Sequence, residues 1–317
     1  MRFRCEHLTG LAALRPIGWL CLTSLAALAL TLLASCRTCP PSPAGDPPPL
    51  EGTVPLAAIQ LTTSYEQAVA RQNERLKRLQ FLDSRGVVEL RFVENDSEHF
   101  EQCDLRLYAV LPSKSALQLS KLGSRYAWIG SDEERWWVFR MDRTPTTLEI
   151  QPWTDKRHMD DDGADGRTGV SVVSPLTMLF LSGLTAFPDP SLVTLSESRG
   201  ALVAESKSAR WTLDRTTSLP LRIELLDDAG RAFASGVLSD YGSAPADNLA
   251  PGDFAKVAHR VIVTRGDGSG SIKLALDSVS ARSDGVKPRF FDLKELQAAM
   301  RPDETIWREA ATTLERP

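Results

Sequence analysis

Apolar and polar residues alternate with a period of two along much of the chain between residues 86 and 282. In the segment "GVVELRF", Leu90 and Phe92 share one side of an extended chain, and in "CDLRLYAVL" Leu105 and Leu107 do the same. Similar short segments follow, each separated from the next by turn residues. Because successive side chains of a strand point to opposite faces, this pattern predicts an antiparallel meander with one buried and one wet face.

Two segments break this period, and both predict helices. Residues 55–82 carry apolar side chains at helical spacing among Gln, Glu and Arg, which predicts an amphipathic helix that packs on a sheet and turns its polar side chains to solvent. The second segment, residues 174–184, reads "SPLTMLFLSGL". Ser174 is suited to cap this helix, Pro175 fits its first turn, and Gly183 marks its end.

The second helix is more apolar than a helix on a finished core requires, so we expect a curved sheet that closes on it. The fold class expected is mainly β with added helices: a curved antiparallel sheet forming an incomplete β-barrel, with the helices as a lid. A barrel not filled by its own side chains leaves room for a ligand. Trp137 shares its strand parity with Phe139, and Trp136 points the other way. The residues expected to line the cavity are Leu90, Phe92, Leu105, Leu107, Trp137, Phe139, Leu176, Leu179, Phe180, Leu221 and Ile223. Plain core packing is the alternative for this set.

The first 36 residues have the layout of an export signal. Three arginines precede the apolar run "IGWLCLTSLAALALTLLA", and small residues follow it. The last four residues, Leu33 to Cys36, resemble the bacterial lipobox, which predicts cleavage before Cys36 and attachment of lipid to its thiol. An uncleaved membrane anchor is the alternative, because a run of about 18 apolar residues is near the lower limit for spanning a bilayer. Both alternatives place the rest of the chain outside the cytoplasm.

Residues 37–55 contain seven prolines, which favour an extended spacer between the membrane and a folded body. We therefore expect a signal peptide over residues 1–35, a linker over 36–55, a folded domain over 56–300 and a tail over 301–317. Arg37 stands where an aspartate would signal retention in the inner membrane of enteric bacteria. This favours a periplasm-facing lipoprotein of the cell envelope, at the outer membrane rather than the inner one.

Charge and size narrow the class of protein further. From Cys36 onward the chain has 282 residues, with 34 basic and 40 acidic side chains, so its net charge of about −6 argues against a general nucleic-acid binder. The length after the linker suits one large β domain, expected to be a monomer. Of the remaining cysteines, Cys39 lies in the linker, and Cys103 is expected to be a small buried residue rather than half of a disulfide.

The chain lacks the common signatures of catalysis. It has no G-x-S-x-G, H-E-x-x-H, phosphate-binding loop or dinucleotide fingerprint. His99, His158 and His259 are far apart and have no ligand-like neighbours, and the aspartates of residues 156–171 do not fit the calcium-loop spacing. We expect no enzyme, no metal and no cofactor, although a glycosidase stays open because its two acids need no fixed spacing.

The order of these pieces resembles a known family. The segments that carry the resemblance are the Gly123–Trp137 run and "WTLDRTTSLPLRIELLDDAGR", a strand with a Leu-Pro step followed by a charged hairpin. They are similar to the LolA/LolB superfamily, the outer-membrane lipoprotein-sorting fold, over residues 62–282. The resemblance implies a hydrophobic cavity for acyl chains of lipids or lipoproteins, and thus a membrane-anchored carrier or chaperone. The same scaffold also serves as an envelope sensor, so a scaffold or sensor that binds a protein partner without transporting a ligand is the alternative.

Overall fold

The structure is a computed structural model that describes residues 56–94, 97–153 and 174–308. The export signal, Cys36, the proline-rich linker and the acidic loop lie outside these residues, so the expectations about them stay predictions. Over the described part of the chain, no helix combines the length and the apolar character needed to cross a membrane.

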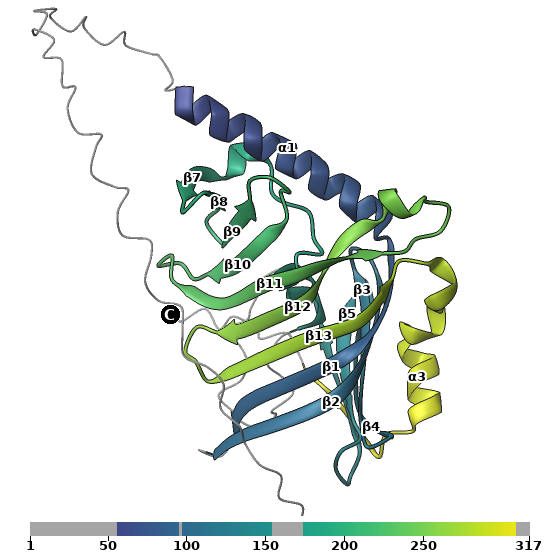
Figure 1. Cartoon of the computed structure of the whole chain (residues 1–317). Helices are drawn as coiled ribbons and strands as arrows, with labels where there is room; N and C mark the ends of the chain where they lie inside the picture. The colour runs from purple at the N-terminus through teal and green to yellow at the C-terminus, as the bar shows by residue number, and fades with distance from the viewer. Residues whose placement is uncertain (1–55, 95–96, 154–173, 309–317) are drawn as a thin grey trace, which may run out of the picture. The chain divides into compact units, whose positions relative to one another are not determined.

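Fourteen strands form one sheet in the order β14-β6-β5-β4-β3-β2-β1-β13-β12-β11-β10-β9-β8-β7 (Figure 1). Neighbouring strands are antiparallel, except that β14 runs parallel to β6. The strands are β1 (Phe81–Glu94), β2 (Ser97–Val110), β3 (Lys114–Lys121), β4 (Ser124–Ser131), β5 (Arg135–Arg140), β6 (Thr147–Pro152), β7 (Thr194–Ser198), β8 (Ala201–Glu205), β9 (Ala209–Asp214), β10 (Pro220–Leu226), β11 (Ala232–Ala244), β12 (Ala255–Arg265), β13 (Gly270–Ser280) and β14 (Glu304–Trp307).

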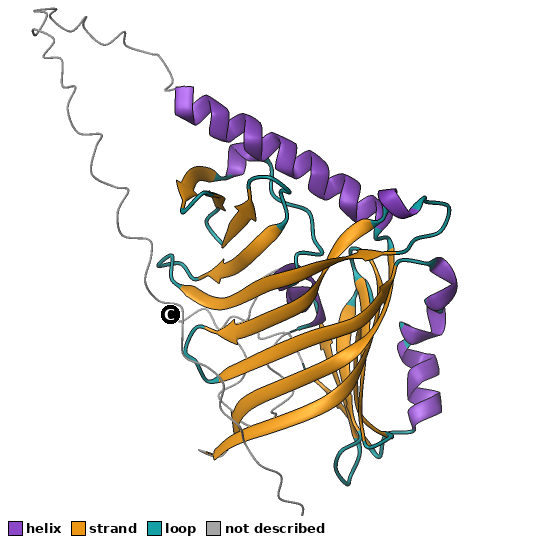
Figure 2. Ribbon diagram, viewed as in Figure 1, coloured by secondary structure: helices purple, strands orange, loops and turns teal. Residues whose placement is uncertain are grey.

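Three α-helices accompany the sheet: α1 (Leu56–Arg78), α2 (Pro175–Leu181) and α3 (Leu293–Met300). Four short 3-10 turns connect elements: η1 (Pro190–Leu192), η2 (Pro251–Asp253), η3 (Ser283–Gly285) and η4 (Pro288–Phe290). Helix α1 packs on β7, β8 and β12, whereas α2 contacts β3 and β4 on one side and β10 and β11 on the other (Figure 2). Six strands lie between β4 and β10 in the sheet order, so the sheet curves round α2. The predicted mainly β fold, with a curved antiparallel sheet that does not close, is confirmed.

The local signals at the ends of α2 are also confirmed. The Ser174 hydroxyl accepts a hydrogen bond from the Thr177 amide at 3.3 Å, and Pro175 occupies the first turn. Gly183 follows the helix with a φ of +68°, a left-handed conformation that a residue without a side chain adopts readily.

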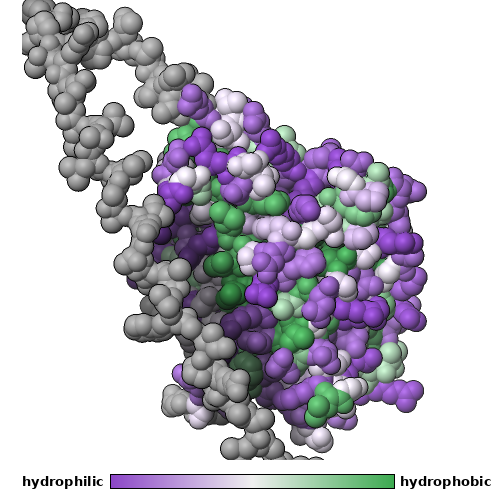
Figure 3. All heavy atoms as spheres, viewed as in Figure 1, coloured by the Kyte–Doolittle hydropathy of each residue, from purple (hydrophilic) through white to green (hydrophobic). Residues whose placement is uncertain are grey.

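Two clusters of buried apolar residues lie on the two faces of the sheet. We call the concave face, which α2 covers, the inner face, and the opposite face the outer face. The cluster on the inner face, the inner cluster, includes Leu105, Leu119 and Ala127. The outer cluster includes Tyr108 and Trp128 and is covered by the segment from η3 to α3. Polar residues cover much of the surface that faces the viewer, with apolar side chains in separate patches (Figure 3).

The sheet continues past residue 300, where the sequence placed the start of the tail. Strand β14 pairs with β6 over residues 304–307. The Asp303 carboxylate accepts hydrogen bonds from the amide and hydroxyl of Thr146, at 2.7 and 2.9 Å. These bonds fix the segment between α3 and β14 to the turn between β5 and β6.

Candidate functional site

The structure brings together most of the residues that the sequence placed around a cavity. Buried in the inner cluster are Leu90, Leu105, Leu107, Leu179 and Ile223, and packed against it are the partly buried Phe92, Leu176 and Phe180. Trp137 and Phe139 belong to the outer cluster. Leu221 belongs to neither and is 38% exposed, beside an irregularity in the pairing of β10 with β9.

The register of the strands explains why Trp137 and Phe139 lie apart from the rest. Leu105 pairs with Leu119, Leu119 with Ala127, and Ala127 with Arg140, so these four side chains share the inner face. Phe139 precedes Arg140 and therefore points to the outer face. Trp137 shares that face, over Gly130, where an added Cβ would lie 2.6 Å from the indole nitrogen.

Helix α2 packs closely on the inner face. Its side chains Met178, Leu179 and Leu181 are buried, and Phe180 meets the ring of Trp211 on β9 edge-on, with ring centroids 5.8 Å apart. On β11, a Cβ added to Gly236 would lie 2.3 Å from the Leu181 carbonyl oxygen. The glycine therefore allows the backbone of α2 to approach the sheet more closely than any other residue would.

Two polar side chains of α1, which we call the α1 clamp, hold the end of α2. Gln72 donates from Nε2 to the carbonyl oxygens of Gly183 and Thr185, at 3.0 and 2.6 Å. Arg75 donates from Nη2 to the same Gly183 oxygen, from Nη1 to the Lys256 oxygen at 3.0 Å, and from Nε to the Gln72 amide oxygen at 3.0 Å. A guanidinium is well placed at the end of a helix, where carbonyl groups lack partners.

The α1 clamp is buried, contrary to the expectation that the polar residues of this helix face solvent. Arg75 is 7% exposed and Gln72 is 2% exposed. Burial lowers the pKa of Arg75, and the charge of nearby Tyr241 partly opposes this shift. The helical spacing of the sequence indicates this burial. Both residues continue the buried stripe of Tyr65, Ala68 and Leu79, at intervals of three and four residues.

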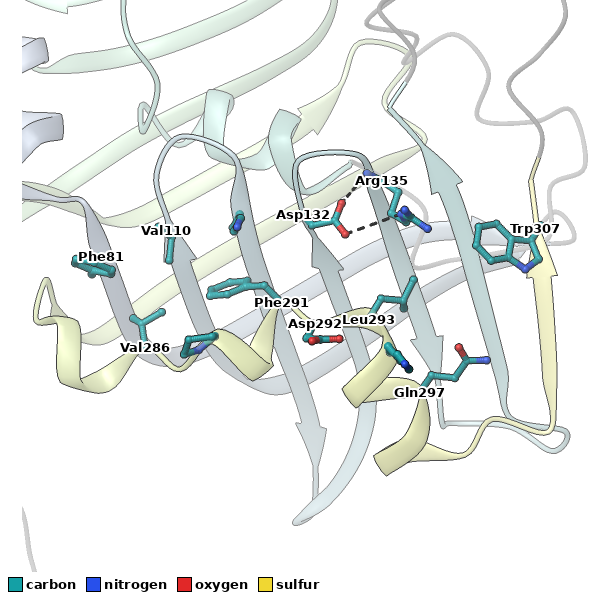
Figure 4. A pocket seen from close by; sticks show the side chains of 13 residues that line it. Phe81, Val110, Asp132, Arg135, Val286, Phe291, Asp292, Leu293, Gln297 and Trp307 are labelled. Atoms are coloured by element: carbon teal, nitrogen blue, oxygen red, sulfur yellow. Dashed lines mark hydrogen bonds and ion pairs between the residues drawn. The ribbon is translucent and has the colours of Figure 1, made fainter.

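A separate groove of about 690 Å³ lies on the outer face (Figure 4). Apolar side chains such as Phe81 and Phe291 line one part, and Asp132, Arg135 and the 61% exposed Trp307 line another. None of the eleven residues proposed from the sequence lines it. The groove is therefore distinct from the inner face that α2 covers.

Within residues 56–94, 97–153 and 174–308, no group of three or more His, Cys, Asp and Glu side chains is placed to hold a metal ion. His99 stacks on Phe92, with ring centroids 5.2 Å apart. Cys103 is a free thiol in the inner cluster, as expected for a small buried residue.

No protein-family model matches this chain, and no curated protein matches its sequence. Solved structures with a similar fold do exist. A LolA superfamily protein from Nitrosomonas europaea is 11% identical over 72% of this chain and 97% of its own, with a TM-score of 0.43. An outer-membrane lipoprotein-sorting protein domain from Vibrio parahaemolyticus is 12% identical over 73% of this chain and 99% of its own, with a TM-score of 0.45.

A third similar structure is that of a DUF1329 family protein from Desulfovibrio piger. It is 11% identical over 75% of this chain and 99% of its own, with a TM-score of 0.48. Likeness at this level of identity concerns the fold alone.

Proposed function

We propose that this protein binds an apolar ligand on the inner face of the sheet, in the place that α2 occupies, and serves as a carrier or chaperone for lipid or lipoprotein acyl chains. The observation that carries the proposal is the position of α2. This short helix contacts both β3 and β4 and the distant β10 and β11, so it fills the concavity of a sheet that does not close. A ligand that replaced α2 would meet apolar side chains from both arms of the sheet.

The free energy gained by burying the side chains of α2 indicates which kind of ligand can replace the helix. Helix α2 buries Pro175, Met178, Leu179 and Leu181. At about 1.5–3 kcal/mol for each fully buried apolar side chain, exposing these four costs about 6–12 kcal/mol when nothing replaces the helix. A chain of about ten methylene groups would regain a similar amount, at about 0.8 kcal/mol each. The ligand that fits this requirement is a long acyl or alkyl chain.

The proposed ligand predicts a distinctive response in hydrogen exchange. The amides of Ser182 and Leu184 donate within the α2 segment, to Met178 and Leu179, each at 2.9 Å. Addition of saturating 1-dodecanol to the full chain should accelerate exchange of these amides, because a displaced helix loses its hydrogen bonds. Exchange in α3, which lies on the outer face, should stay unchanged. Exchange measured by mass spectrometry at peptide resolution gives both results in one experiment.

The opposite response would exclude this site. Slower or unchanged exchange in the α2 segment, with dodecanol bound, would mean that α2 stays in place as ordinary core. The alternative function, a scaffold or sensor that binds a protein partner, predicts no dodecanol binding and no lipid retained in native mass spectra of the purified protein.

We further propose that the domain is attached to the cell envelope through lipid on Cys36, facing the periplasm, with the proline-rich linker as a tether. The support is the lipobox-like Leu33–Cys36 after an apolar run. Inhibition of the lipoprotein signal peptidase in a bacterial host should cause a precursor with residues 1–35 to accumulate, visible as a larger band on immunoblots. The Cys36→Ala variant should show the same larger band without inhibitor. Unchanged size in the presence of the inhibitor would contradict cleavage at this site.

A further inference from the structure

Arg140, the last residue of β5, places a positive charge beside the apolar residues of the inner cluster. It pairs in register with Ala127, a fully buried residue of the inner cluster. The arginine itself is only 3% exposed. Tyr126, which is packed against the same cluster, precedes Ala127 along β4. A guanidinium at this position is desolvated, which is unfavourable unless its donors find acceptors.

Among the residues that the structure describes, two of the three guanidinium nitrogen atoms of Arg140 find no acceptor. These are Nε and Nη1, which are buried and make no hydrogen bond. Its Nη2 atom lies 3.6 Å from Oδ2 of Asp142, which is longer than a hydrogen bond, and the same carboxylate lies 3.8 Å from the exposed Arg143. Asp142 therefore provides a nearby charge but leaves the planar fork of donors unoccupied.

A second buried arginine shows that the fold can satisfy such a group. Arg75 is as deeply buried, yet its Nε, Nη1 and Nη2 atoms each donate to an oxygen of the protein. Arg75 is thus explained as a structural tie between α1 and α2, whereas within the described part of the chain Arg140 has only the long ion pair with Asp142. Guanidinium groups bind carboxylates and phosphates through two parallel hydrogen bonds, so an anion is the chemistry that fits the free donors.

We infer that Arg140 binds the anionic head group of an amphipathic ligand whose alkyl chain lies on the inner face. This inference rests on the proposed function and adds to it the class of the ligand: an alkyl chain that ends in a carboxylate or a phosphate. Tyr126 is suited to assist as a neutral hydrogen-bond donor, since burial, followed by the charge of Asp142, raises its pKa to about 12.

The inference is tested with ligands of one chain length and different head groups. Isothermal titration of the full chain with 1-dodecanol, dodecanoate and dodecyl phosphate should show tighter binding of at least one anion, by about tenfold or more, as expected for a charge-assisted hydrogen bond. The ratio of the affinities for the two anions shows whether a carboxylate or a phosphate is bound more tightly. In Arg140→Met the anion should lose this advantage, whereas dodecanol should bind as in the parent protein.

Arg143→Gln is the matched control, because Arg143 shares Asp142 but lies at the surface. This variant should keep the preference for the anion. Equal binding of dodecanol and both anions by the parent protein would overturn the inference and leave the proposed function standing, whereas failure of all three ligands to bind would overturn both. An Arg140→Met variant that does not fold would also overturn the inference, because it would identify the guanidinium as a structural support.

Discussion

Replacement of Gly236 by alanine should raise the affinity for a fluorescent acyl-chain probe by about 5- to 150-fold. The new Cβ would lie 2.3 Å from the Leu181 carbonyl oxygen, a backbone atom of α2 that cannot turn away. Overpacking of this kind costs about 1–3 kcal/mol, and the cost falls only on the state in which α2 covers the inner face. Apparent affinity rises in proportion to the fraction of open protein, and each 1.4 kcal/mol changes that fraction about tenfold. Fluorescence titration of the parent protein and the variant measures the ratio of their two affinities for the probe.

Gly242→Ala is the control on the same strand. A Cβ there would lie 2.4 Å from Nε2 of His259, so this variant also introduces a steric conflict, but one that does not involve α2. It should lower the melting temperature without a gain in affinity. If Gly236→Ala behaves in the same way, with lower stability and no tighter binding, α2 is part of a permanent core and the proposed function loses its main support.

Replacement of Arg75 by methionine should lower the free energy of unfolding by about 2–3 kcal/mol and should also tighten binding of the probe. Methionine keeps the apolar stem but donates no hydrogen bond. The partly buried Lys256 oxygen then loses its guanidinium partner, and the Gly183 oxygen keeps only Gln72. Each buried acceptor left without a partner costs about 1–3 kcal/mol. Denaturant titration measures the stability, and the probe reports the opening of α2.

Arg78→Met, three residues further along α1, is the appropriate comparison. Arg78 pairs with Glu74 at 3.0 Å and donates to the Asp253 oxygen at 2.6 Å, both at exposed positions. Its loss should change the free energy of unfolding by less than about 1 kcal/mol. A neutral or stabilising effect of Arg75→Met would show that desolvation of the guanidinium outweighs its hydrogen bonds. In that case the α1 clamp would not hold α2 in place.

The strands, the two helical segments and the ends of α2 could be predicted from the sequence, because each depends on local chemistry. The alternation in β1 and β2 reports the inner face correctly, since Leu90, Leu105 and Leu107 all belong to the inner cluster. Ser174, Pro175 and Gly183 define the ends of α2 through backbone preferences that need no tertiary contact.

The faces of β5 could not be assigned in the same way. A period of two identifies the buried face only when the other face meets water, and both faces of β5 are buried from Trp137 to Arg140. The segment from η3 to α3 covers one face and the inner cluster the other. The prediction that Trp137 and Phe139 share one face was therefore correct. Which face they share depends on a segment about 150 residues further along the chain.

The sequence by itself thus determined the mainly β class, the alternation within each strand and the short apolar helix, because these follow from periodicity and from the backbone preferences of individual residues. Only the tertiary structure decided that Gln72 and Arg75 hold α2 and that Gly236 lies under it. It also decided that Arg140 is buried with two nitrogen atoms that find no acceptor among the described residues. These facts depend on contacts between segments far apart in the chain, where a polar residue at a buried position is satisfied or left unsatisfied by partners that no local pattern identifies.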